Sequence, residues 1–184
     1  MATLAIGLVL GFAVSIPPGP NSALCVSLAS GGVRRAMPLI TGAALTDAAY
    51  SLLAASGILL ASRTGVETLR YLTPAFLFAT AALTWWPTSI PSRAFAAVPV
   101  LNPATALIWL GLSSVPALQA LSLPEALLRP IPVALGTATW FVLLAVVSAK
   151  AGTYLGPGRL RLIGRWVGGL LVVLGLAELL ALLT

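Results

Sequence analysis

The sequence contains no histidine and a single cysteine, Cys25. One cysteine can form neither a disulfide within the chain nor a dithiol relay. Without histidine or a cysteine cluster, the chain also lacks the usual ligand sets for zinc, haem and iron–sulfur clusters. We therefore expect neither a metal site nor a cofactor.

Charge is also scarce, because only 8% of the residues are charged while 59% are hydrophobic. A soluble globular protein carries roughly a quarter charged residues. A helix needs about 20 mainly apolar residues to cross a bilayer, so six spans would nearly use up the 184 residues. We predict an all-α integral membrane protein with one transmembrane domain over residues 1–184, in contact with the lipid bilayer. No room remains for an extramembrane catalytic domain.

The small number of acidic residues leaves a net charge of +6, from ten Lys and Arg against four Asp and Glu. Such a balance can indicate nucleic-acid binding. Here, however, the basic residues stand singly or in small groups between apolar runs, where they set membrane orientation. We therefore expect no nucleic-acid partner.

Apolar runs bounded by proline, glycine and arginine predict the transmembrane spans. The third run is the shortest and ends in two tryptophans, which suit the membrane interface better than the bilayer centre. No basic stretch precedes the first run, so we expect it to be a retained span and not a cleaved signal. The predicted spans are Leu4–Ser27, Pro38–Leu60, Leu72–Trp86, Ala96–Val115, Ile131–Ala149 and Val167–Leu183.

Basic residues are unevenly divided between the connections, which alternate sides of the membrane if there are six spans. Cytoplasmic connections are richer in Lys and Arg. The first, third and fifth connections contain seven basic residues and the second and fourth only three, so we predict a plasma-membrane protein with both termini outside. The first group is Arg34, Arg35, Arg93, Lys150, Arg159, Arg161 and Arg165; the second is Arg63, Arg70 and Arg129.

Residues 1–90 and 91–184 resemble each other. In the first half a proline-broken segment, Ile16–Leu24, precedes an apolar span with glycine and small polar residues; in the second half Val98–Leu107 does the same. Two related halves of three spans each enter the membrane in opposite orientations, as in many secondary transporters. We predict two inverted three-helix repeats whose first spans, the first and fourth of the chain, are broken.

The two broken segments supply the first candidate binding residues. Proline lacks an N–H and breaks a helix where it sits, and broken helices in membranes tend to line transport pathways. A helix restarting at either segment exposes N–H groups that could hold a carboxylate. Alternatively, these prolines only end helices near the interface. The candidates are Pro18, Gly19, Pro20, Asn21, Asn102 and Pro103.

Asp47 lies near the middle of the second predicted span. An ionised carboxylate there costs at least ~2.5 kcal/mol on insertion scales. On a helix it shares a face with Ala43, Tyr50 and Ser51, a polar stripe suited to a cavity wall. We expect Asp47, with Tyr50 beside it, to pair with a substrate ammonium group or to carry a proton. The alternative is a packing role, in which Asp47 is hydrogen-bonded to a neighbouring helix.

Pairs of glycines recur four residues apart, for example at Gly7 and Gly11 and at Gly164 and Gly168. This spacing lets helices approach closely and sometimes supports dimerisation. We expect it to serve packing within the chain and leave open a homo-oligomer.

Three motifs together resemble those of LysE-type (lysine exporter/threonine efflux) amino-acid exporters. They are the Pro-Gly-Pro-Asn run ending at Asn21, the stretch Gly42–Asp47 and the Leu-Asn-Pro run ending at Pro103. The resemblance covers most of the chain and implies export of amino acids or related small metabolites from the bacterial cytoplasm. It also implies that an ion gradient drives export without nucleotide hydrolysis. The third span, with Pro74 and two tryptophans, departs from the family pattern.

From these observations we expect a secondary transporter that works by alternating access. An intramembrane enzyme would need paired catalytic groups such as two aspartates, a Ser–His pair or a histidine cluster, and the sequence contains none, so we expect no catalytic residues. Two alternatives stay open: a non-transporting membrane scaffold or assembly subunit, and an exporter of inorganic ions. One intramembrane carboxylate is a poor ligand set for the latter.

Overall fold

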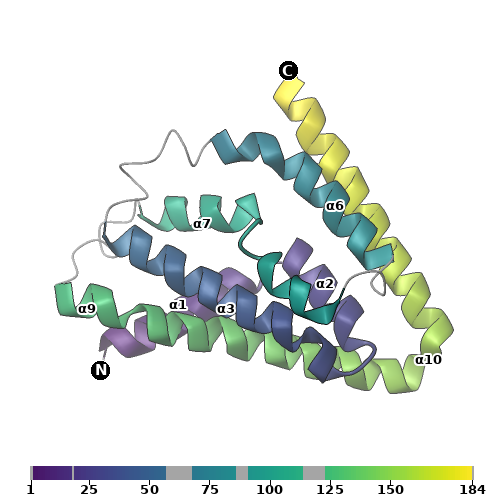
Figure 1. The fold of residues 1–184 in the computed structure, drawn as a ribbon, viewed down its shortest axis with the longest axis horizontal. Helices are drawn as coiled ribbons and strands as arrows, with labels where there is room; N and C mark the ends of the chain where they lie inside the picture. The colour runs from purple at the N-terminus through teal and green to yellow at the C-terminus, as the bar shows by residue number, and fades with distance from the viewer. Residues whose placement is uncertain (1, 18, 57–67, 86–90, 114–122, 184) are drawn as a thin grey trace.

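Helices make up the fold of every described segment, and no strand occurs in these segments. The computed structural model describes residues 2–17, 19–56, 68–85, 91–113 and 123–183. The all-α prediction is therefore confirmed for this part of the chain. The helices in chain order are α1 (Ala2–Ser15), α2 (Pro20–Ala29), α3 (Val33–Ala55), η1 (Leu69–Leu72), α6 (Thr73–Trp85), η3 (Ser92–Ala97), α7 (Pro103–Ser113), α9 (Leu123–Leu128) and α10 (Pro130–Leu183) (Figure 1).

The first predicted span is broken, as its prolines indicated. α1 ends at Ser15, α2 begins at Pro20, and the two helices meet at 82°. Gly19 is the N-cap of α2 and Pro20 is its first residue. Proline is common at this position because its fixed φ suits a helix and the N–H that it lacks would have no partner there. The chain therefore changes direction near the centre of the fold.

α3 follows a tight turn and starts five residues before the predicted start of the second span at Pro38. Its N-cap, Gly32, has a φ of 113°, in the left-handed region that glycine adopts without steric cost. Pro38 lies inside the helix and removes only one backbone hydrogen bond of its first turns. α3 then runs to Ala55; the predicted end at Leu60 lies outside the described residues.

α10 joins the fifth and sixth predicted spans into a single helix of 54 residues. The predicted connection between them, which includes Lys150 and Arg165, is helical. Figure 1 shows α10 as two arms that meet at a sharp bend: the first arm lies along α1 and α3, and the second lies along α6. The sequence predicts a separate connection between the fifth and sixth spans. The chain instead stays helical there and changes direction through a bend in α10.

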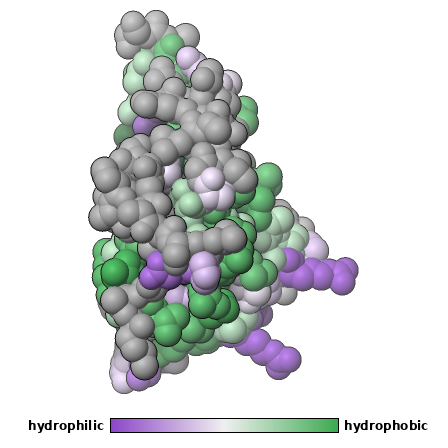
Figure 2. Space-filling model, turned by 90° about the vertical axis from the view of Figure 1, so that its left-hand side faces the viewer, coloured by the Kyte–Doolittle hydropathy of each residue, from purple (hydrophilic) through white to green (hydrophobic). Residues whose placement is uncertain are grey.

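In the part of the chain that the structure describes, three stretches are long and apolar enough to cross a membrane: Val33–Ala55, Pro124–Tyr154 and Arg165–Leu182. A fourth is added if the bent pair of α1 and α2 counts as one span. α6 and α7 are apolar but shorter. Only 17% of the last stretch is buried, so most of its apolar side chains face outwards, and Figure 2 shows hydrophobic side chains on much of the coloured surface in view.

α1 and α10 pack backbone against backbone. A Cβ atom added at Gly11 would collide with the carbonyl of Val133, and one added at Gly136 would collide with the carbonyl of Leu8. Glycines at such positions let two membrane helices approach closely. The close contact brings the polar residue that follows Gly136, Thr137, to the backbone of α1, and this position matters for the site described next.

Candidate functional site

A cavity of about 190 Å³ lies where the broken segments meet the middle of α3. Its walls come from the end of α1, the start of α2, α3, the segment 99–109, and Phe141 of α10. Polar side chains from all of these elements except α10 line it. They belong to Ser15, Asn21, Ser22, Thr46, Asp47, Asn102, Thr105 and Trp109.

Asp47 is buried in this cavity wall and accepts hydrogen bonds from two other helices. The indole Nε1–H of Trp109, on α7, donates to Oδ1 at 2.9 Å. The hydroxyl of Thr137, on α10, donates to Oδ2 at 2.7 Å. Trp109 and Thr137 have no solvent exposure, so both partners are held in place by packing. Both donors bond more strongly to the ionised form of Asp47 than to its neutral form, whereas burial opposes the charge.

The start of α2 faces the same cavity with its backbone donors uncapped. No side chain caps this helix, and Pro20 has no N–H to contribute. The first amide of α2 that bonds back to the N-cap is that of Ala23, to the carbonyl of Gly19 at 3.0 Å. The amides of Asn21 and Ser22 precede it, and helix amides at these positions have no partner within the helix. This end carries the partial positive charge of the helix dipole.

The start of α7 reaches the cavity too, but Asn102 already occupies its donors. The side-chain Oδ1 of Asn102 accepts from the amide of Ala104 at 3.1 Å, and its carbonyl accepts from Thr105 at 3.2 Å. This confirms the Asn-Pro start signal. The two helix ends are therefore unequal. Within the described residues, the first amides of α7 are paired by Asn102, whereas no partner is found for the amides of Asn21 and Ser22 at the start of α2.

Two polar atoms in the cavity wall have no hydrogen-bond partner among the described residues. They are Oδ1 of Asn21 and Oγ1 of Thr46; the side chain of Thr46 is only 5% exposed. A buried polar group left unpaired costs roughly 1–3 kcal/mol. A polar ligand in the cavity would remove this cost, so both atoms indicate a binding site.

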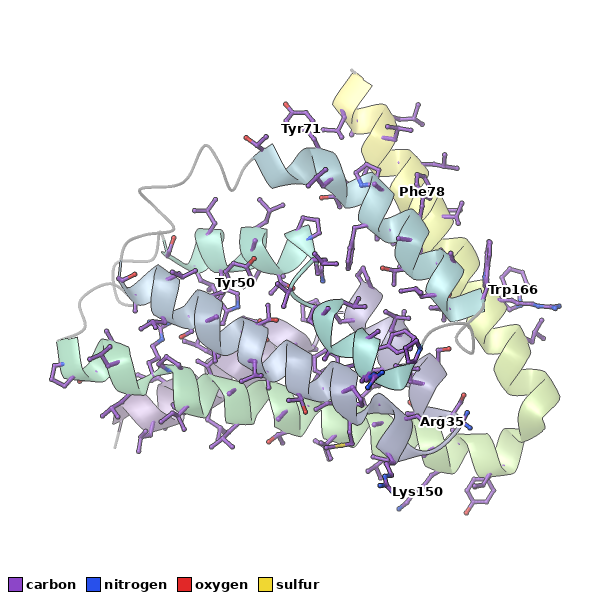
Figure 3. The ribbon with its side chains drawn as sticks, viewed as in Figure 1. Arg35, Tyr50, Tyr71, Phe78, Lys150 and Trp166 are labelled. Carbon is purple, nitrogen blue, oxygen red and sulfur yellow. The ribbon has the colours of Figure 1, made fainter. Side chains whose placement is uncertain are left out.

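The structure separates the predicted site residues into two groups. Gly19, Pro20, Asn21, Asp47 and Asn102 line the cavity. The other candidates are Tyr50, Pro103 and Pro18. Tyr50 is half-buried and packs against a hydrophobic cluster around Ala54 and Trp109 (Figure 3). Pro103 is buried at the start of α7 and does not line the cavity. Pro18 lies outside the described residues.

Trp109 and Thr137 were missed as partners of Asp47. They lie 62 and 90 residues away from it in the chain. A polar residue inside an apolar run was the only signal for Thr137, and Trp109 gave none. The described residues contain no group of three or more His, Cys, Asp or Glu side chains that could hold a metal ion.

A scan against protein-family models, a search of curated proteins and a search of solved structures each found no match for this chain. Function is therefore inferred from the residues of the cavity and their arrangement.

Proposed function

We propose that the protein is a secondary transporter that exports amino acids or related small metabolites across the bacterial plasma membrane. One observation carries the proposal: a buried carboxylate, Asp47, and the uncapped positive end of α2 line the same cavity. An amino acid has a complementary pair of groups. Its ammonium group would face Asp47, and its carboxylate would accept from the amides of Asn21 and Ser22 at the start of α2.

The size of the cavity supports a small substrate. Pockets for drug-sized ligands measure about 300–1,000 Å³, whereas this one measures about 190 Å³. The unpartnered atoms of Asn21 and Thr46 would bond to the polar groups of the substrate. Because the lining residues include no basic side chain, the backbone of α2 is the main partner that the cavity offers to a carboxylate.

Alternating access between two halves of the molecule would move the substrate. We propose six spans in two inverted repeats, 1–90 and 91–184. The packing supports this plan, because α3 and the first arm of α10 run antiparallel along each other, as do α6 and the second arm (Figure 1). In each half, a broken segment precedes these helices and reaches the central cavity.

The basic residues support a cytoplasmic assignment for one end of the molecule. Arg34 and Arg35 at the start of α3, Arg93 of η3 and Lys150 of α10 are all exposed. The helix segments that carry them meet in one hydrophobic cluster, which contains Ala36, Phe95 and Ala145; Figure 3 shows Arg35 and Lys150 at the same end of the fold. By the positive-inside rule, this end would face the cytoplasm and both chain termini the outside.

Efflux from loaded cells tests the proposal. Cells loaded with a mixture of amino acids would express wild type, Asp47→Asn or an empty vector, with mass spectrometry following the medium. We expect wild type to export one or a few amino acids and Asp47→Asn to lose this export. Glu178→Gln is the matched control, because Glu178 is exposed on α10 and does not line the cavity. Equal export by the wild-type protein and the empty vector would favour a scaffold role or a different substrate.

A further inference from the structure

The hydroxyl of Thr137 lies between two acceptors but carries only one hydrogen. Its Oγ1 is 2.7 Å from Oδ2 of Asp47 and 3.1 Å from the carbonyl oxygen of Gly11. A threonine hydroxyl can donate one hydrogen bond and accept others. Therefore it bonds to Asp47 or to Gly11 at any moment, and the choice depends on whether Asp47 itself carries a proton.

We propose that Thr137 is a positioning residue that lets Asp47 gain and lose a proton without leaving any group of this network unpaired. With Asp47 ionised, Thr137 donates to Oδ2, and the carbonyl of Gly11 keeps the hydrogen bond from the hydroxyl of Ser15 at 2.9 Å. With a proton on Oδ2, the carboxyl group donates to Oγ1 of Thr137, whose own hydrogen turns to Gly11. Trp109 donates to Oδ1 in both states.

The change between the two states needs only a rotation of one hydroxyl hydrogen. A hydronium ion in the cavity transfers its proton to Oδ2 of Asp47 and leaves as water. The transfer forms one O–H bond on Asp47 and breaks one O–H bond of the hydronium ion. No heavy atom has to move, because the glycine contacts between α1 and α10 hold the carbonyl of Gly11 beside Thr137. Neither the ionised nor the protonated state of Asp47 therefore leaves a buried polar group unpaired, which would cost free energy.

Few other titratable groups surround this network. α1 and α7 contain none in their sequences, and the cavity-lining residues include none besides Asp47. On α2, the thiol S–H of Cys25 donates a hydrogen bond to the carbonyl of Phe141, and Cys25 does not line the cavity. On α3, Tyr50 packs in the cluster around Ala54. α10 carries Lys150 at the exposed basic end, and Arg129 just before its start is buried. Asp47 is thus the group whose charge responds to pH in the cavity.

If the proposed function holds, on which this consequence rests, proton and substrate compete for one carboxylate. Protonated Asp47 binds an ammonium group more weakly because it has lost its charge, and an ammonium group bound to ionised Asp47 opposes protonation. Export of the substrate in exchange for protons would follow from this competition.

Infrared spectroscopy of the purified protein tests the switch without any substrate, so its failure is distinguishable from failure of the proposed function. The band of the protonated carboxyl group is followed as a function of pH and assigned with Asp47→Asn. Thr137→Val keeps the shape of the side chain and removes the hydroxyl. At a given pH, we expect the ratio of protonated to ionised Asp47 to be about tenfold higher in Thr137→Val than in wild type, because the ionised form loses the stronger hydrogen bond. The midpoint of the titration would then move up by about one pH unit.

Thr137→Ser should titrate as wild type does, since it keeps the hydroxyl. The matched control is Thr139→Val, because Thr139 is exposed on the same helix and bonds to the carbonyl of Leu135. If Thr137→Val does not fold, Thr137→Ala provides the same test with a smaller side chain. A titration unchanged by loss of the Thr137 hydroxyl would overturn the proposal, as would an Asp47 that stays in one protonation state across the stable pH range of the protein.

Discussion

Asp47 is the residue on which the site depends, and its donors Trp109 and Thr137 differ in what they can do. The indole of Trp109 can only donate, whereas the hydroxyl of Thr137 can donate or accept. Trp109 therefore fixes the position of the carboxylate, and Thr137 adapts to its charge. Both donors approach from helices other than α3, so the carboxylate also ties three helices together at the cavity.

Replacing Trp109 by phenylalanine should impair export. The substitution removes the donor to Oδ1 of Asp47, and a hydrogen bond to a charged group contributes about 1.5–3 kcal/mol. We expect a fall in transport rate of about tenfold or more, measured as efflux of the identified substrate. Trp140→Phe is the matched control, because the indole nitrogen of Trp140 has no partner among the described residues. Similar losses of export in both variants would contradict a special role for Trp109.

Thr46 offers a test that separates binding from stability. Its hydroxyl is buried, unpartnered and part of the cavity wall. Thr46→Val keeps the shape but removes an unpaired polar atom, so the free energy of unfolding should stay the same or rise. Export should nevertheless weaken, because the substrate loses a partner.

The measurements for Thr46→Val are the half-saturation concentration for export and the unfolding temperature in detergent. Thr46→Ser, which keeps the hydroxyl, should retain the affinity. A variant that is destabilised and binds as well as wild type would mean that the hydroxyl serves packing.

At the scale of elements, helix starts and helix contacts have different physical origins. α2 and α7 begin where Gly-Pro and Asn-Pro sequences place an N-cap before a proline, which is local chemistry. The contact of α1 with α10 depends on glycines from both helices. It brings Thr137 to Gly11 and so builds the network around Asp47.

Enlarging Gly136 should separate these helices. A methyl group there would collide with backbone atoms of Leu8 and Phe12, which cannot move aside as a flexible side chain could. Overpacking of this kind costs about 1–3 kcal/mol, so Gly136→Ala should lower the unfolding temperature and reduce export.

Gly169→Ala is the matched control on the same helix, since no atom lies within 4 Å of an added Cβ there. It should be neutral or slightly stabilising, because alanine favours a helix by up to about 1 kcal/mol over glycine. Equal stability of the two variants would show that α1 and α10 can move apart at little cost.

For the whole molecule, the orientation in the membrane can be measured directly. Single cysteines would be introduced into a Cys25→Ser background as Arg34→Cys or Lys150→Cys at the basic end, or as Leu127→Cys on α9, an exposed position. A membrane-impermeant maleimide added to intact cells should label only Leu127→Cys. All three should react after the cells are permeabilised. Labelling of Arg34→Cys from outside would reverse the proposed orientation.

Local sequence was sufficient for the helical class and for several helix boundaries. A highly hydrophobic chain with little charge indicates membrane helices, because a helix pairs its backbone polar groups within itself. A proline interrupts the helix in which it stands. For this reason the break before Pro20 and the start of α7 after Asn102 could be predicted. The candidate role of Asp47 followed from the cost of a charge in an apolar run.

The partners of Asp47, the continuity of α10 and the position of Tyr50 depend on how the helices pack. Trp109 and Thr137 reach the carboxylate only because helices far apart in the chain cross at the cavity. A helical face near Asp47 suggested Tyr50, but the direction from which α7 approaches places this side chain in a hydrophobic cluster. Such contacts are set by the shapes of whole helix surfaces, and residue types along a single helix carry too little information to specify them.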